Sequence, residues 1–146
     1  QGLDGGRINI ASCSLGAARF CIEKTIHYIN ERKQFGKYLK DFQSIQFKLA
    51  DMITEFEAAK LMVHKAALAI DKKENNSTIM SAMAKRYATD VCFKICNEAL
   101  QIHGGYGYLA DFGIEKMVRD CRVHQILEGT NEIMRVIISR KLLERD

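Results

Sequence analysis

Apolar residues recur at three- and four-residue steps over most of the chain, and this spacing predicts three long helices with one apolar stripe each. The first stripe comprises Ile8, Ala11, Leu15, Ala18, Ile22, Ile26 and Ile29. The second comprises Ile45, Leu49, Met52, Phe56, Ala59, Val63, Ala66 and Ile70. The third comprises Ala84, Ala88, Val91, Cys92, Ile95, Ala99 and Ile102. Because each stripe must be buried against another element, the pattern predicts a helical bundle.

Polar and glycine-containing segments mark where these helices begin and end. Asp4, with glycines beside it, is expected to cap the first helix, and Ser77 is expected to cap the third. The segment 32–43 loses the apolar period around Gly36 and is expected to be a loop. The polar, Asn-rich segment 71–77 predicts the turn between the second and third helices.

The last third of the chain predicts shorter elements. The third helix is expected to stop at 103–105, where glycine can adopt the left-handed conformation that ends helices. A glycine-rich loop then leads to a short helix near 114–121, and Thr130 or Asn131 is expected to cap a last helix that ends near Leu143. No segment reads convincingly as a strand. The sequence therefore predicts an all-α, up-and-down four-helix bundle with an additional short helix.

Composition narrows the class of protein without identifying it. The 146 residues have the length of one domain, and their 47% hydrophobic and 27% charged content is that of an ordinary globular protein. The net charge of +4 is spread along the chain, which favours a solvated surface over an anionic ligand or partner and lacks the pattern of nucleic-acid binding. No apolar run reaches the roughly 18 residues of a membrane span, and no signal peptide is recognisable. Because the chain begins with Gln1, we expect a fragment or a processed product.

The cysteines and histidines offer little chemistry by themselves. Five cysteines without the spacing of a disulfide framework favour a reducing compartment. Cys92 and Cys96 lie one helical turn apart, but no second ligand pair is evident, so buried thiols are favoured over a metal site. His103 and His124 have no carboxylate or cysteine at ligand or triad spacing and are expected to pack or hydrogen-bond.

Glu128 stands out because it follows the apolar pair Ile126 and Leu127 and precedes Gly129 at a helix start. A simple solvated surface does not place a carboxylate there. One interpretation is a charge that interacts favourably with the N-terminus of the last helix. The other is a functional carboxylate, which the surrounding motifs favour.

Four local patterns occur in order along the chain: LDGGR at 3–7, RKQFG at 32–36, QIHGGYGY at 101–108 and ILEGTNE at 126–132. Together they resemble the C-terminal domain of the acyl-CoA dehydrogenases over essentially the whole chain. The resemblance implies a single helical-bundle domain at 1–146, taken from a larger flavoenzyme whose N-terminal helical and middle β domains are absent from this sequence. It also implies little or no turnover by this domain alone.

The resemblance further implies FAD-dependent oxidation of the Cα–Cβ bond of an acyl-CoA. Glu128 matches the base that removes the α proton in most family members, although some carry the base on another helix. The backbone N–H of that Glu is expected to donate to the thioester oxygen. An apolar setting beside Ile126 and Leu127 is expected to raise the pKa of the base, and Gly129 to give the acyl group room.

The expected substrate is a short branched acyl-CoA. The overall resemblance implies oxidation of isobutyryl-CoA to methacrylyl-CoA in valine degradation. Leu127 departs from the Tyr that medium- and short-chain members often have before the catalytic Glu, and a leucine suits a small branched acyl group better.

The remaining site residues are assigned by their positions in the four motifs. Arg32 matches an arginine that binds the FAD pyrophosphate of a neighbouring subunit, and its guanidinium suits two phosphate oxygens. The positions assigned to FAD are Arg32, Gln34, Phe35, Phe42, Gln43, Gln101, Ile102, His103, Gly104, Gly105, Thr130, Asn131 and Glu132. Those assigned to the CoA substrate are Asp4, Gly5, Gly6, Arg7, Gly129 and Arg140. No metal is expected. Simpler roles stay open for some of them: a surface charge for Arg32, core packing for the two phenylalanines, a helix stop for the two glycines and a macrodipole contact for Arg140.

The resemblance also implies partners and a location. Electrons are expected to pass to electron-transferring flavoprotein, and the subunits to form a homotetramer built as a dimer of dimers. The location is expected to be the mitochondrial matrix in a eukaryote or the cytoplasm in a bacterium. The alternatives are an acyl-CoA oxidase, another short-chain acyl-CoA dehydrogenase, and a non-catalytic helical oligomerisation module in which Glu128 is only a helix-start charge.

Overall fold

Helices make up nearly all of the molecule, whose computed structural model describes residues 2–143. In chain order the elements are α1 (Gly2–Glu31), β1 (Lys33–Gln34), β2 (Lys37–Tyr38), the 3-10 helix η1 (Leu39–Asp41), α2 (Gln43–Asp71), α3 (Ser77–His103), α4 (Gly105–Tyr108), the 3-10 helix η2 (Ala110–Phe112), α5 (Ile114–His124) and α6 (Asn131–Leu143).

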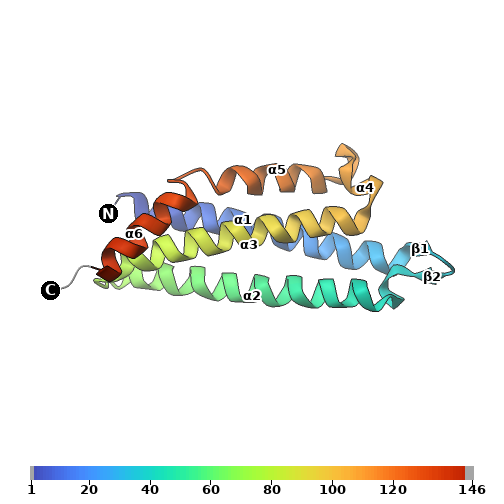
Figure 1. Cartoon of the computed structure of the whole chain (residues 1–146), viewed down its shortest axis with the longest axis horizontal. Coiled ribbons are helices and arrows are strands. Elements are labelled where there is room, and N and C mark those ends of the chain that lie inside the picture. The colour runs from blue at the N-terminus through green and yellow to red at the C-terminus, as the bar shows by residue number, and fades with distance from the viewer. Residues whose placement is uncertain (1, 144–146) are drawn as a thin grey trace.

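The helices α1, α2, α3 and α5 run side by side along an elongated bundle, and each runs opposite to the one before it (Figure 1). Helix α3 is central, because it packs against α1, α2, α5 and α6. The short helix α6 lies at the end of the bundle that also holds the start of α1, and the β1–β2 hairpin lies at the opposite end. This arrangement confirms the predicted all-α, up-and-down bundle.

The three predicted stripes form the core. Every predicted residue of the third stripe is buried, and alanines recur on all three facing helices. Small side chains let helix axes approach closely, which suits long helices that pack side by side along their length. Ile26 is an exception to the predicted pattern, because it lies at the edge of the first stripe and is 42% exposed.

Two helix starts differ from their predictions. Helix α1 begins at Gly2, so Asp4 lies inside the first turn, where its carboxylate accepts hydrogen bonds from Arg7 and Thr78 and does not cap the helix. Helix α3 begins with Ser77 as its first residue, so Ser77 is not the cap either. The Asp4 prediction was wrong because a local cap pattern does not report a partner on another helix, here Thr78 on α3.

The segment that was expected to be a plain loop contains a small antiparallel hairpin. Lys33 pairs with Tyr38 and Gln34 pairs with Lys37. The two residues at its tip, Phe35 and Gly36, both have positive φ (53° and 75°), as a two-residue hairpin turn requires. A strand of two residues is too short to show the alternation of apolar and polar residues by which strands are predicted from sequence.

The remaining helix ends follow the predictions more closely. Helix α3 ends at His103, and Gly104 adopts φ 59° and ψ −138°. This conformation is open to glycine but is not the left-handed helical one that was expected. At the start of α6, the Ile133 N–H donates to Thr130 Oγ1 at 3.3 Å, so Thr130 and not Asn131 acts as the cap.

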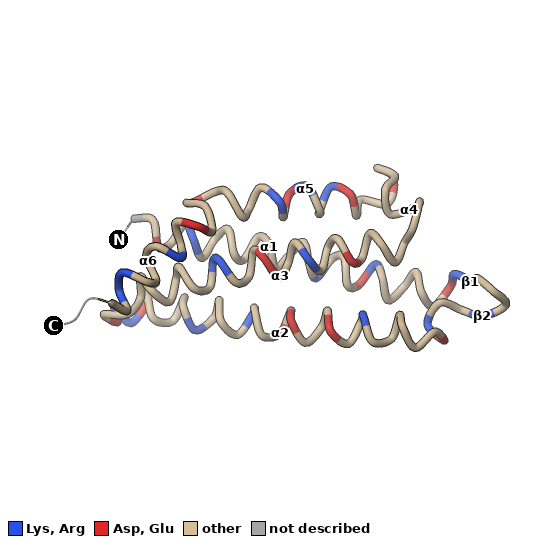
Figure 2. Tube along the Cα trace, in the orientation of Figure 1, with Lys and Arg blue, Asp and Glu red and all other residues tan. Residues whose placement is uncertain are grey.

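Charges of both signs are interspersed along the helices, without a block of one sign (Figure 2). This distribution agrees with the predicted solvated surface. Within residues 2–143, no helix combines the length and the apolar character that crossing a membrane requires.

Candidate functional site

The predicted site residues gather in two groups at opposite ends of the bundle (Figure 1). Glu128 and the residues around it lie near the start of α1, whereas Arg32 and segment 101–105 lie near the hairpin. From Gly6 to Glu31, α1 extends roughly 38 Å at 1.5 Å per residue. The two groups therefore form separate sites on this chain.

The Glu128 corner, defined as residues 125–131, connects α5 to α6 through two successive residues of positive φ. Glu128 has φ 56° and Gly129 has φ 89°. For a residue with a side chain this conformation costs about 1–2 kcal/mol, and it persists only where surrounding contacts enforce it. The contacts around the corner should therefore explain why Glu128 is held there.

One such contact is with α1. A Cβ atom placed on Gly6 would lie 2.8 Å from Cδ and 3.2 Å from Oε1 of Glu128. The carboxylate therefore lies directly against the α1 backbone, at a position where only a glycine leaves room for it. The sequence assigned Gly6 to the substrate, and the structure places it beside the predicted base.

A second set of contacts anchors the corner to α3 through Lys85. Its side chain is fully buried, and its ammonium donates to the Gly129 carbonyl at 2.8 Å and to Asn131 Oδ1 at 2.9 Å. Burial lowers the pKa of Lys85 to about 8, against the opposing attraction of acidic neighbours that include Asp90 and Glu128. Lys85 was not predicted from the sequence as part of any site.

Asn131 completes this network. It is 3% exposed, and its Nδ2 donates to Asp90 Oδ1 at 2.7 Å and to Thr89 Oγ1 at 2.9 Å. Gln125 at the other end of the corner also donates to Asp90 Oδ1, at 2.8 Å, and its carbonyl accepts the Asn131 N–H at 3.0 Å. The Asn131 side chain, predicted to contact FAD, is thus occupied by partners within the chain.

The outer face of the corner is open in residues 2–143. Ile126 and Leu127 are 49% and 43% exposed, and Glu128 is exposed as well. The two apolar side chains therefore do not by themselves enclose the carboxylate as expected. An apolar site at this face requires atoms from outside the described chain.

Asp4 and Arg7, which were assigned to the substrate, form a buried ion pair near the corner. Arg7 NH1 donates to Asp4 Oδ1 at 2.8 Å, and Thr78 Oγ1 donates to Asp4 Oδ2 at 2.8 Å. Asp4 is 6% and Arg7 7% exposed, so both mainly contact the chain itself. Arg7 Nε is buried and has no hydrogen-bond partner.

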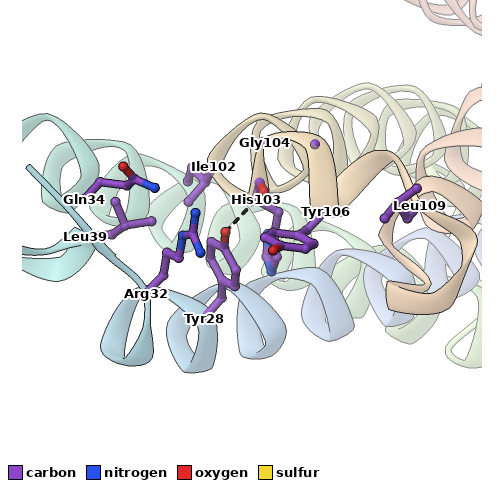
Figure 3. Close-up of a pocket in the computed structure, with 10 residues that line it drawn as sticks. Tyr28, Arg32, Gln34, Leu39, Ile102, His103, Gly104, Tyr106 and Leu109 are labelled. Carbon is purple, nitrogen blue, oxygen red and sulfur yellow. Dashed lines mark hydrogen bonds between the residues drawn. The ribbon is translucent and has the colours of Figure 1, made fainter.

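The second group lines a cavity of about 500 Å³ at the hairpin end (Figure 3). The lining residues come from α1, the hairpin, η1 and the α3–α4 junction: Tyr28, Arg32, Gln34, Leu39, Ile102, His103, Gly104, Gly105, Tyr106 and Leu109. Besides Arg32, five other residues that were assigned to FAD line this cavity: Gln34, Ile102, His103, Gly104 and Gly105. The structure thus brings together residues that the motifs place far apart in the sequence.

Aromatic contacts hold the wall of this cavity. The rings of Tyr28 and His103 stack with centroids 4.4 Å apart, and the Tyr28 hydroxyl donates to the His103 carbonyl at 3.4 Å. His103 Nδ1 donates to the Ala99 carbonyl at 2.8 Å, which fixes its ring. The Arg32 guanidinium lies over the Tyr106 ring at 5.5 Å, and its nitrogens project toward the cavity (Figure 3).

The turn after α3 depends on Gly107, which the sequence reasoning did not single out. A Cβ on Gly107 would lie 2.6 Å from the Leu100 carbonyl oxygen and 2.9 Å from His103 Cβ. This close approach lets α4 fold back on the last turn of α3 and places Tyr106 at the cavity. The glycine-rich spacing of 104–107 was the available signal, but it did not show which glycine is required.

The other predicted FAD and CoA residues are mostly exposed around the two ends. Phe35 is 91% exposed at the hairpin tip, and Phe42 is partly buried at the start of α2. The remaining positions on solvent-facing surfaces are Gly5, Gln43, Gln101, Glu132 and Arg140. Their predicted ligand contacts stay predictions.

The thiols and histidines have structural surroundings. Cys96 Sγ and Cys121 Sγ lie 3.7 Å apart in the core, and burial raises the pKa of Cys92. His124 Nδ1 lies 2.8 Å from Ser14 Oγ, which connects α5 to α1, and burial lowers the pKa of His124. Among residues 2–143, no three histidine, cysteine or acidic side chains are grouped to hold a metal ion.

Comparison with known proteins identifies the family. Residues 1–143 match the family described as "Acyl-CoA dehydrogenase, C-terminal domain". The chain is 54% identical over 144 residues to isobutyryl-CoA dehydrogenase, mitochondrial, of Bos taurus, an alignment that covers 99% of this chain and 35% of that relative. It is 50% identical over 143 residues to the caffeyl-CoA reductase-Etf complex subunit CarC of Acetobacterium woodii, covering 98% of this chain and 38% of that relative.

A solved structure shows the same fold. The structure of butyryl-CoA dehydrogenase from Megasphaera elsdenii superposes with a TM-score of 0.94 at 43% identity, over 97% of this chain and 37% of that one. This chain thus spans little more than a third of the length of these relatives. The family match over residues 1–143 and the shared helical fold show that the chain belongs to the acyl-CoA dehydrogenase family, where it corresponds to the C-terminal domain.

Proposed function

We propose that this chain is the C-terminal part of a FAD-dependent dehydrogenase that oxidises the Cα–Cβ bond of a short branched acyl-CoA, with Glu128 as the base. The observation that carries this proposal is the geometry of the Glu128 corner. Contacts to α1 and α3 hold the backbone of Glu128 at positive φ, and the Glu128 carboxylate lies on a face that is open to a ligand. A charge that served only to stabilise a helix start would not need this conformation.

The corner supplies two groups that suit the reaction. The Glu128 carboxylate takes the α proton of the thioester, which is weakly acidic and needs a base close to it. Among residues 2–143, the N–H of Glu128 has no hydrogen-bond acceptor, whereas the N–H groups of Ile126, Leu127 and Asn131 are bonded within the chain. The free N–H can donate to the thioester oxygen as negative charge develops there.

The hairpin-end cavity fits a phosphate-bearing cofactor. Its lining combines the Arg32 guanidinium, which suits two phosphate oxygens, with the bare backbone of Gly104 and Gly105, beside which no atom lies within 4 Å of an added Cβ. Arg32 and Gln34 would hold the pyrophosphate region, and Tyr106 would flank it. Bound FAD supplies the two-electron oxidant for the Cα–Cβ bond.

The separation of the two sites supports an oligomer. Since Glu128 and Arg32 lie at opposite ends of α1, we expect Arg32 of one subunit to hold FAD that acts beside Glu128 of another. The outer face of α2 supports the same conclusion, because Ile53, Leu61 and Leu68 are 41%, 66% and 53% exposed. They follow one another at intervals of eight and seven residues, so they share one face. A homotetramer that packs α2 against neighbouring subunits would bury this row.

The names of two relatives support a substrate and an electron acceptor for the proposed reaction. The bovine relative is named for isobutyryl-CoA, and we expect this chain to take part in oxidising isobutyryl-CoA to methacrylyl-CoA, a step of valine degradation. The name of the A. woodii relative includes an Etf complex, and this supports electron-transferring flavoprotein as the acceptor. If the source is eukaryotic, the expected location is the mitochondrial matrix, as for the bovine relative; in a bacterium it is the cytoplasm.

The substrate proposal is tested with the full-length flavin-bound protein that contains this chain. The protein is mixed without oxygen with isobutyryl-CoA, butyryl-CoA or isovaleryl-CoA, and loss of the oxidised flavin absorbance is followed. We expect isobutyryl-CoA to reduce the flavin fastest. Fast reduction only by a different acyl-CoA would contradict the substrate assignment, and no reduction by any of them would favour a non-catalytic module. Rapid reoxidation by air in place of electron-transferring flavoprotein would favour an oxidase.

A further inference from the structure

Lys85 is the least expected residue of the Glu128 corner. It lies on the inner face of α3, in register with Ala88 and Cys92 of the apolar stripe, and its side chain is fully buried. A buried ammonium loses its hydration at high cost unless polar partners replace the water. Its two hydrogen-bond acceptors, the Gly129 carbonyl and Asn131 Oδ1, both belong to the corner. An apolar residue would fill this core position at lower cost, so the corner is what requires the lysine.

The two bonds act on the part of the corner that has the least stable backbone. Gly129 directly follows Glu128 and is the second of the two residues of positive φ. Fixing the Gly129 carbonyl fixes the Gly129–Thr130 peptide plane, so it restrains the backbone one residue after Glu128. The bond to Asn131 fixes the first residue of α6, so the two bonds of Lys85 span the corner from Gly129 to the helix start.

The rest of the network holds the same segment at its edges but not at its centre. Asp90 accepts hydrogen bonds from Gln125 and Asn131, which anchors the first and last residues of the corner. Gly6 only leaves room for the Glu128 carboxylate and donates nothing to its backbone. Among residues 2–143, Lys85 is the side chain that hydrogen-bonds to the backbone between Glu128 and Thr130.

From this geometry we infer that Lys85 is a positioning residue for catalysis, which holds Glu128 at the orientation needed to take the substrate proton. This inference rests on the proposed role of Glu128 as the base. Lys85 itself does not touch the substrate, because it is buried behind the corner. Its effect should therefore appear in the rate of proton abstraction and not in substrate affinity.

Replacing Lys85 by methionine separates positioning from stability. Lys85→Met leaves the Gly129 carbonyl and Asn131 Oδ1 without their donor, which destabilises the fold. It also removes a charge from the core, which opposes that loss. The net change in stability is expected to be small, whereas the orientation of Glu128 is lost. Ile95→Val is the matched control, because Ile95 is a core residue of the same helix, 2% exposed and away from the corner.

The test uses the full-length flavin-bound protein. We expect Lys85→Met to lower kcat per bound flavin roughly a hundredfold, the scale for a misplacement of about 1 Å, with KM for isobutyryl-CoA unchanged within about threefold. Amide hydrogen exchange over 125–131 is expected to accelerate at least tenfold, with no change in α2. Ile95→Val should change neither kcat nor this exchange.

The possible results are distinct. If Lys85→Met keeps its kcat per flavin within threefold of wild type, or if exchange at 125–131 is unchanged, the positioning role is overturned and Lys85 is only a core residue. A Glu128→Gln variant is assayed in parallel to test the proposed function separately. If Glu128 is not the base, Glu128→Gln stays active. The exchange result for Lys85→Met does not depend on that outcome. If Lys85→Met does not yield flavin-bound protein, Lys85→Gln, which keeps an N–H donor without the charge, is judged by the same two criteria.

Discussion

Substituting alanine for Gly6 should slow catalysis without destabilising the protein. The added Cβ would lie 2.8 Å from Glu128 Cδ, whereas carbon atoms in contact prefer about 3.5–4.0 Å. Because the atoms in conflict belong to the end of a flexible side chain, the helix can stay in place and the carboxylate must move by about 1 Å. A misplacement of this size costs roughly a hundredfold in rate, or about 2.7 kcal/mol of activation free energy.

Stability should change in the opposite direction. Alanine favours an α-helix over glycine by about 1 kcal/mol, so the Tm of Gly6→Ala should be equal to or above that of wild type. Gly16→Ala is the matched control: Gly16 lies on the same helix, and an added Cβ there meets no atom within 4 Å. It should show the same gain in Tm with an unchanged rate.

The assay is stopped-flow reduction of the flavin in the full-length protein by saturating isobutyryl-CoA, with thermal unfolding measured in parallel. A slow rate together with an undiminished Tm in Gly6→Ala alone supports the contact between Gly6 and the base. Equal rates for Gly6→Ala and Gly16→Ala would refute the reasoning, because the Glu128 carboxylate would then not be held against α1.

Two further predictions concern other parts of the fold. Burial lowers the pKa of His124. As the pH falls, the His124 side chain of the unfolded chain therefore takes up a proton near pH 6.5, before that of the folded chain does. The stability that neutral His124 contributes is thus present above that pH and lost as the pH falls below it. Tm measured from pH 7.5 to 5.5 should therefore fall more steeply in wild type than in His124→Gln, and parallel curves would contradict this. Gly107→Ala places a Cβ 2.6 Å from the Leu100 carbonyl, which cannot move easily, so unfolding should become easier by about 1–3 kcal/mol and FAD should be retained less well. Calorimetry and flavin content would show this, and a melting curve like that of Gly16→Ala would contradict it.

The sequence predicted the helices well because the helices are stabilised by burial of apolar stripes, and the three- and four-residue spacing of these stripes is visible in the local sequence. It failed at the start of α1, because the Asp4 carboxylate is bonded to Thr78 on α3, and no local pattern reports that partner. The hairpin was missed for a related reason: two-residue strands carry no periodicity, and its tip places Phe35 at positive φ.

The grouping of the candidate site residues could be predicted only in part. The motifs assigned residues to a FAD site, and five of them line one cavity with Arg32. The motifs could not show that this cavity and Glu128 lie at opposite ends of α1, since order along the chain does not give distance in a bundle of long helices. Lys85 was missed because a lysine next to Ala84 in an amphipathic pattern usually faces solvent, and only the position of Gly129 explains its burial.

The most direct test of the account is the rate at which isobutyryl-CoA reduces the flavin in Glu128→Gln beside wild type, in the full-length protein without oxygen. Glutamine keeps the size of the side chain and its place against Gly6 but cannot accept the α proton. We expect rapid loss of the oxidised flavin absorbance in wild type and at least a thousandfold slower loss in the variant, in the range expected when a positioned general base is removed. Equal rates in the two proteins would contradict it and leave Glu128 a structural residue at the start of α6.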